Sequence, residues 1–119
     1  MYSYGKHNID EEDIESLISV LKSGMLTQGP LCNKFEELLS EYFGSSFATV
    51  VSNGTAALHL TGLALGWKKG DIVLTTPMTF LATANCIIYS GAEPQFVDID
   101  SETYNICPEK LDQKIKELK

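Results

Sequence analysis

The sequence predicts an α/β fold, in which a mainly parallel sheet carries helices on both faces. Short apolar runs alternate with helical patterns along most of the chain, and Gly and Pro residues separate them. An order of strand, helix, strand, helix implies crossover connections, which make neighbouring strands parallel and place helices on both faces. The hydrophobic content of 44% is ordinary for a globular protein. The expected strands are residues 47–51, 72–75 and 95–97.

Two helices are expected before the first strand. Asp10 is typical of an N-cap, and apolar residues then recur at helical spacing up to about Lys22. After a Gly-Pro pair, a second amphipathic pattern includes Phe35 and Tyr42 and stops at Gly44. Further helices are expected at 55–65, at 80–89 and from Pro108 onward, with an exposed turn at 66–71.

The charge and composition limit the partners of the chain. The formal net charge is -7, whereas nucleic-acid binding normally needs a basic face, so no nucleic-acid partner is predicted. All nine basic residues are Lys, and no guanidinium is present for bidentate recognition of an anion. An anion site in this chain must therefore use backbone amides, hydroxyl groups or Lys.

Membrane segments, metal sites and disulfides are not expected. No stretch approaches the roughly 20 apolar residues that span a bilayer, and the N-terminus lacks the apolar region of a signal peptide, which favours a cytoplasmic protein without membrane contact. Cys32, Cys86 and Cys107 are widely spaced, and neither His7 nor His59 has a Cys or carboxylate at ligand spacing. The three cysteines are interpreted as reduced thiols, and His59 as a structural residue on the helix after the 52–54 turn.

The most informative segment is the Ser-Asn-Gly turn at 52–54, which joins an apolar run to a helix-forming stretch. The first amides of a helix lack internal partners, and the helix dipole adds partial positive charge there, so such a turn suits a phosphate. Gly54 permits close approach, Thr55 adds a hydroxyl donor, and the small side chain of Ala56 leaves its amide unshielded. An ordinary strand-to-helix turn uses the same residue types, and that alternative stays open.

A second polar segment, residues 75–80, also follows a predicted strand. In open parallel sheets, ligands bind beyond the carboxyl ends of the strands, so both segments are expected to line one crevice. Phe80 could supply a flat aromatic ring there, and packing in the core is its alternative role. Asp98 and Asp100 are interpreted as turn residues rather than as an acid–base pair. The chain has no G-x-G-x-x-G or Walker A motif.

Five motifs, at residues 52–58, 70–73, 76–85, 91–92 and 97–100, follow one another along the chain. Taken in order, they resemble the N-terminal part of the DegT/DnrJ/EryC1/StrS family of sugar aminotransferases. The resemblance covers essentially the whole chain, including the loop at 26–30. The Tyr4 opening, the helix start at Asp10 and the Leu26-Thr27 loop are similar to the branch that aminates a UDP-linked 4-keto-6-deoxy-N-acetyl sugar on the pseudaminic acid pathway.

The resemblance implies an enzyme that depends on pyridoxal 5′-phosphate (PLP) and has the aspartate-aminotransferase fold, known as fold type I. Residues 1–28 would form an N-terminal helix and a substrate-side loop, and residues 29–119 an incomplete N-terminal portion of the large PLP-binding domain. The full-length protein would be a homodimer with each site at the subunit interface. A nucleotide sugar would be the substrate, and glutamate the expected amino donor.

The resemblance also implies roles for individual residues. The backbone amides of Thr55 and Ala56 would bind the cofactor phosphate, and Phe80 would stack on the pyridine ring. A second group would meet the substrate or its cofactor adduct, although Tyr4 could instead be a frayed terminal residue and the loop a plain connector. This group comprises Tyr4, Gly24, Met25, Leu26, Thr27 and Gly54.

No catalytic residue is predicted within these 119 residues. The lysine that forms the Schiff base and the acidic partner of the pyridine nitrogen lie beyond residue 119 in the family, so the chain is expected to be a fragment that does not transaminate alone. Two alternatives stay open. One is a non-catalytic module that binds a phosphorylated ligand or pairs with another subunit, and the other is a PLP-dependent sugar dehydratase of the same family.

Overall fold

The computed structural model describes residues 5–119, and the predicted substrate contact Tyr4 lies outside them. The chain divides into two compact units, one ending at Val50 and the other spanning Val51–Lys119. Each unit is described by itself. The predicted domain boundary between residues 28 and 29 stays a prediction.

The first unit contains two helices, α1 (Glu11–Leu21) and α2 (Pro30–Phe43). Asp10 caps α1 as expected, because its carboxylate accepts a hydrogen bond from the Asp13 amide while the Asp13 carboxylate accepts one from the Asp10 amide, each at 3.1 Å. Helix α2 begins with Pro30 at its first position and ends at Gly44, whose φ of 63° satisfies a left-handed C-cap.

The strand expected at 47–51 is not formed, so that prediction was wrong. Residues 47–51 are extended or irregular and have no ladder partner among the described residues. Phe47 is 89% exposed, and the Val50 amide donates to the Glu36 side chain at 2.8 Å instead of to a neighbouring strand. An apolar run adopts strand structure only when another strand completes its hydrogen bonds.

The second unit contains the sheet. Strands β1 (Ile72–Thr75) and β2 (Glu93–Phe96) are parallel, with Ile72 opposite Glu93 and Thr75 opposite Phe96. Of the three expected strands, two are present in residues 5–119, and β2 begins two residues earlier than predicted. The chain beyond β2 forms one antiparallel bridge, between Ile99 and Ile106.

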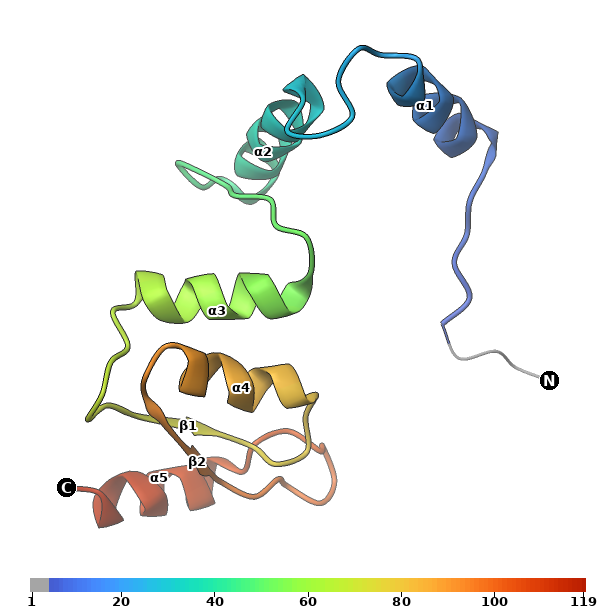
Figure 1. Ribbon diagram of the computed structural model, residues 1–119. Coiled ribbons are helices and arrows are strands. Elements are labelled where there is room, and N and C mark those ends of the chain that lie inside the picture. The colour runs from blue at the N-terminus through green and yellow to red at the C-terminus, as the bar shows by residue number, and fades with distance from the viewer. Residues whose placement is uncertain (1–4) are drawn as a thin grey trace. The chain divides into compact units, whose positions relative to one another are not determined.

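Three helices accompany this sheet, as Figure 1 shows. Helix α4 (Leu81–Tyr89) connects the two strands and lies against one face of the sheet, and α3 (Gly54–Ala64) packs on α4. Helix α5 (Pro108–Glu117) lies on the opposite face. Both faces are thus covered, as the sequence predicted. Among residues 5–119, no helix is both long enough and apolar enough to cross a membrane.

The core of this unit is small and lies between α4 and the strands. It contains Cys86, Ile87 and Ala92, with Trp67 and Val73 packed against them. The turn at 66–71 was expected to be exposed. For Trp67 this prediction was wrong, because its indole packs against the apolar cluster of Cys86, Ile87 and Ala92. Helix α4 buries only one side, and Leu81, Ile88 and Tyr89 on its other side are more than half exposed.

Gly62 is where α3 approaches its neighbours most closely. A Cβ atom added there would lie 2.7 Å from Cε3 of Trp67 and would also collide with Oγ of Ser90. Ser90 is itself fixed, because its hydroxyl donates to the Cys86 carbonyl at 2.8 Å. The absence of a side chain at residue 62 therefore sets the spacing between α3 and α4.

Replacement of Gly62 by Ala should destabilise the second unit. Overpacking at this contact should lower the free energy of unfolding by about 1–3 kcal/mol, which thermal and urea unfolding at a fixed protein concentration would measure. Gly54→Ala is the matched control on the same helix, because a Cβ there meets nothing within 4 Å. Equal stability of Gly62→Ala and Gly54→Ala would contradict the close-approach argument.

Candidate functional site

The turn before α3 is held by the side chain of Asn53. Asn53 is the N-cap in extended conformation, and its Oδ1 accepts a hydrogen bond from the Ala56 amide at 2.9 Å. Its Nδ2 donates to Oγ of Ser52 at 3.0 Å. These two bonds use both ends of the Asn53 amide group and give the turn a defined shape before α3 begins.

The first two amides of α3 remain available to a ligand. Gly54 and Thr55 occupy the first and second helical positions, where a backbone N–H has no acceptor within the helix. Nothing lies within 4 Å of the position that a Gly54 side chain would take, so an anion can approach the backbone there. The positive end of the helix dipole adds to the attraction of these amides for an anion.

The Ala56 amide is in a different state from the Thr55 amide. It already donates to Oδ1 of Asn53, so a phosphate would have to share this amide with Asn53 or displace the asparagine side chain. The sequence missed this competition, although an Asn three residues before Ala56 is the pattern of a helix N-cap. The phosphate contacts of Thr55 and Ala56 stay predictions.

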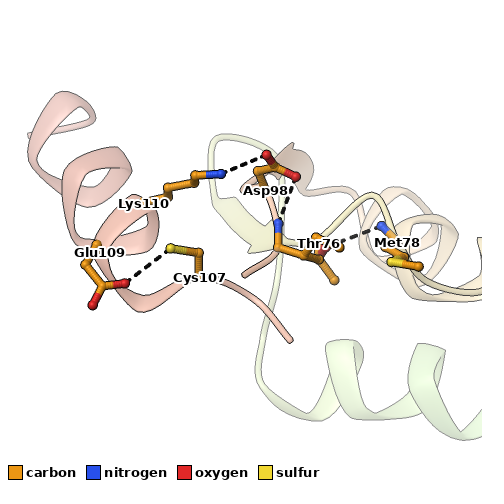
Figure 2. A network of polar contacts seen from close by, with 7 residues as sticks. Thr76, Met78, Asp98, Cys107, Glu109 and Lys110 are labelled. Atoms are coloured by element: carbon orange, nitrogen blue, oxygen red, sulfur yellow. Dashed lines mark hydrogen bonds and ion pairs between the residues drawn. The ribbon is translucent and has the colours of Figure 1, made fainter. Parts of the chain in front are cut away.

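Phe80 ends the segment that follows β1. It was expected within the helix but is the N-cap of α4, whose first residue is Leu81. Its side chain is 78% exposed, so among the described residues Phe80 is not a core residue. The loop before it is ordered by a hydrogen bond from the Met78 amide to Oγ1 of Thr76 at 3.3 Å (Figure 2). An open aromatic face therefore stands next to the carboxyl end of β1.

The two predicted segments lie at the same end of the second unit. In Figure 1, the N-terminal ends of α3 and α4 and the carboxyl ends of β1 and β2 all point the same way. The predicted crevice-lining positions Gly54, Thr55 and Phe80 are therefore at one edge. Residues 24–27 belong to the first unit, in which Met25 and Leu26 are 57% and 63% exposed. Their contact with substrate stays a prediction.

The segment after β2 forms a second polar cluster (Figure 2). Nζ of Lys110 lies 2.8 Å from Oδ2 of Asp98, and the Ile99 amide donates to the other oxygen of Asp98 at 2.9 Å. The Lys110 hydrogen bond, followed by that from Ile99, lowers the pKa of the Asp98 carboxyl below its ordinary value. The same contact raises the pKa of Lys110.

Asp100 is a turn residue, as predicted. Its Oδ1 accepts hydrogen bonds from the Thr103 amide at 2.8 Å, the Thr103 hydroxyl at 2.9 Å and the Glu102 amide at 3.1 Å. These donors, with the Thr103 amide the largest cause, lower the pKa of the Asp100 carboxyl. A carboxylate with this many donors remains charged and is poorly suited to accept a proton in catalysis. Within residues 5–119, no three potential metal ligands come together.

Comparison with known proteins identifies the family of the chain. The model of the DegT/DnrJ/EryC1/StrS aminotransferase family matches residues 7–119. The chain belongs to this family. The resemblance drawn from the sequence motifs is confirmed.

Individual relatives agree with this assignment. The chain is 45% identical over 115 residues to a UDP-4-amino-4,6-dideoxy-N-acetyl-β-L-altrosamine transaminase of Campylobacter jejuni, and the match covers 97% of the chain and 30% of that enzyme. The chain is much shorter than its curated relatives. The matched region is only 28% to 30% of the length of each relative compared.

Solved structures support the fold. The chain matches the PLP form of a Streptococcus pneumoniae sugar aminotransferase with a TM-score of 0.81 and 33% identity, over 89% of the chain and 27% of that structure. It matches the E. coli GDP-4-keto-6-deoxy-D-mannose-3-dehydratase with bound hydrated PLP with a TM-score of 0.87 and 31% identity, over 95% of the chain and 31% of that structure. The predicted fold-type-I class is confirmed, and the family depends on PLP.

Removal of the Lys110 amine should raise the pKa of the Asp98 carboxyl. In Lys110→Met we expect the midpoint of the Asp98 carboxyl ¹³C shift to move up toward the ordinary value of 3.8, though not fully, since the Ile99 amide still donates. The folded-state pKa is the lowered one, so the pair stabilises the fold above the unfolded-state pKa. That contribution is lost as the pH falls through the folded-state pKa.

Lys116→Met is the control for this titration. It removes the other ion pair of α5, between Lys116 and Asp112 at 2.6 Å, and should leave the Asp98 midpoint unchanged. An Asp98 midpoint that does not move in Lys110→Met would show that the ion pair is not maintained in solution.

Proposed function

We propose that this chain is the part of a PLP-dependent sugar aminotransferase that binds the cofactor phosphate. The proposed substrate is a UDP-linked 4-keto-6-deoxy-N-acetyl sugar of the pseudaminic acid pathway. Family membership and the 45% identity to the Campylobacter jejuni transaminase support this choice. The structural observation that carries the proposal is the open N-terminal end of α3 at the same edge as the exposed ring of Phe80.

The residues of this edge fit a phosphorylated, planar cofactor. The Gly54 and Thr55 amides would donate to a phosphate dianion, and the missing side chain of Gly54 lets the phosphate approach the backbone. The Ala56 amide would also donate to the phosphate, either while it still donates to Oδ1 of Asn53 or after the Asn53 side chain has moved away. No arginine is needed, which agrees with a chain that contains none.

Phe80 would make a further contact with the cofactor. Its ring offers an open apolar face that suits stacking on a pyridine heterocycle and excludes water from one side of it. When bound, PLP supplies the electron sink and the carbonyl that carries the amino group. In this proposal, residues outside 1–119 supply the Schiff-base lysine and the acid that pairs with the pyridine nitrogen.

The remaining predicted contacts would act on the substrate side. The loop of Gly24, Met25, Leu26 and Thr27 carries exposed apolar side chains that suit a sugar ring, and Gly54 would leave space beside the cofactor. Tyr4 is kept as a proposed contact. The proposed amino donor is glutamate. The full-length protein is proposed to be a homodimer that is located in the cytoplasm.

A dehydratase is the second candidate, because the E. coli dehydratase matches the fold with a TM-score of 0.87, compared with 0.81 for the Streptococcus pneumoniae aminotransferase. The matches to the aminotransferase and to the dehydratase cover 89% and 95% of the chain, so both kinds of enzyme share this region. The choice between the two activities therefore has to be made from the reaction product.

The activity should be tested on a protein that extends this chain to the length of its relatives. With PLP, glutamate and a UDP-4-keto-6-deoxy-N-acetyl sugar, we expect a 4-amino sugar and 2-oxoglutarate in equal amounts, measured by mass spectrometry and a coupled dehydrogenase assay. A product that has lost the 3-hydroxyl would favour the dehydratase. Cofactor binding with neither product would overturn both enzymatic proposals and favour a binding module.

Asn53→Asp should weaken phosphate binding without loss of the helix cap. Asp caps helices as well as Asn does, but its negative charge would lie beside the phosphate and should lower the affinity by roughly tenfold or more. The probe is pyridoxamine 5′-phosphate, which has no aldehyde and so does not modify surface lysines. Its binding can be followed through the Thr55 amide shift in ¹H–¹⁵N spectra of the 119-residue chain.

Pyridoxamine without phosphate serves as the ligand control and should leave the Thr55 amide unperturbed. Equal affinity of Asn53→Asp and the wild-type chain for pyridoxamine 5′-phosphate would place the phosphate away from the α3 turn. Thermal unfolding of both proteins would show whether the cap has been kept.

A further inference from the structure

Glu36 makes a long-range contact that the sequence did not indicate. It is a half-buried carboxylate in the middle of α2, and its Oε1 accepts a hydrogen bond from the backbone amide of Val50 at 2.8 Å, across 14 residues of sequence. The neighbouring residue Glu37 is exposed, and its carboxylate makes no hydrogen bond within the described part of the chain. The burial and the partner of Glu36 distinguish it from a solvated surface acid.

This bond ties the segment from Ser46 to Val50 to α2. The first part of that segment, Ser46 to Ala48, lines a groove of about 290 Å³ together with residues of α2. Phe47 is 89% exposed, so this segment has little apolar anchoring, and within the described residues the Glu36 carboxylate is its side-chain hydrogen-bond partner on α2. A hydrogen bond from a neutral amide to an ionised carboxylate is shorter and stronger than one between neutral groups.

Val50 stands four residues before Gly54, the first residue of α3, with Val51, Ser52 and Asn53 between them. Each unrestrained residue adds two rotatable backbone angles, so a fixed Val50 limits the conformations from which the Asn53 cap can form. We propose that Glu36 is a positioning residue, which restrains Val50 and thereby presets the Ser52–Gly54 turn that presents the Thr55 amide to a phosphate. This inference rests on the proposed function of that turn.

The restraint can be tested without catalysis, by amide hydrogen exchange of the 119-residue chain followed by NMR. In Glu36→Ala, exchange of the Val50 amide should be roughly tenfold faster, the order expected for loss of a hydrogen bond to a charged group. Exchange of the Ala56 amide, which donates to Oδ1 of Asn53, should also accelerate, because the turn loses its anchor. Glu36→Gln retains an acceptor oxygen without the charge, so its Val50 amide should exchange at a rate between those of the wild-type chain and Glu36→Ala.

Two further variants separate positioning from a general loss of structure. Glu37→Ala makes the same change one residue later on α2 and should leave exchange at Val50 and Ala56 unchanged. Glu36→Asp keeps the charge but shortens the side chain by one carbon, so it should release Val50 even if Glu36→Ala does not fold. Amides of α2, such as those of Leu38 and Leu39, should exchange as in the wild-type chain in Glu36→Asp.

Binding of pyridoxamine 5′-phosphate gives a second readout. The wild-type chain should bind it more tightly than Glu36→Asp, by about the factor with which exchange at Ala56 accelerates. If Val50 is released while Ala56 exchanges as before, Glu36 restrains Val50 alone and the inference is overturned. If the wild-type chain does not respond to the probe, the proposed function fails, while the exchange comparison still decides whether Glu36 orders the turn.

Discussion

The parallel pairing of β1 with β2 is the constraint on which the second unit depends. Two parallel strands cannot be joined by a hairpin, so the chain must return across the sheet, and α4 is that return. The strands therefore end at the edge where α4 begins. Helix α3 packs on α4 with its N-terminus at the same edge, which brings polar turns and open helix amides together.

Much of this arrangement could be predicted because it is encoded locally. Asp10 caps α1, Gly44 ends α2, and Pro108 begins α5 as expected from the sequence, because capping depends on residues only a few positions apart. The family could also be recognised, because its motifs between Ser52 and Asp100 are short local patterns, and the family model matches residues 7–119.

Features that depend on distant residues could not be predicted. The run at 47–51 has the composition of a strand but lacks a partner strand in the described chain, and the bond between Val50 and Glu36 spans 14 residues with no sequence signal. Trp67 lies in a turn segment, yet the gap left by Gly62 accepts its indole. At the candidate site, the turn that precedes α3 could be predicted, but the hydrogen bond from the Ala56 amide to Asn53 was not recognised.

An anion site made of backbone amides has a consequence for the response to acidity. Peptide N–H groups do not titrate in the physiological range, and this chain contributes no arginine to such a site. The protonation that matters is then that of the bound phosphate group, whose second pKa is about 6 for a phosphate monoester. At the proposed phosphate site, retention of a phosphorylated ligand should therefore follow the ionisation of the ligand and not that of the amides that bind it.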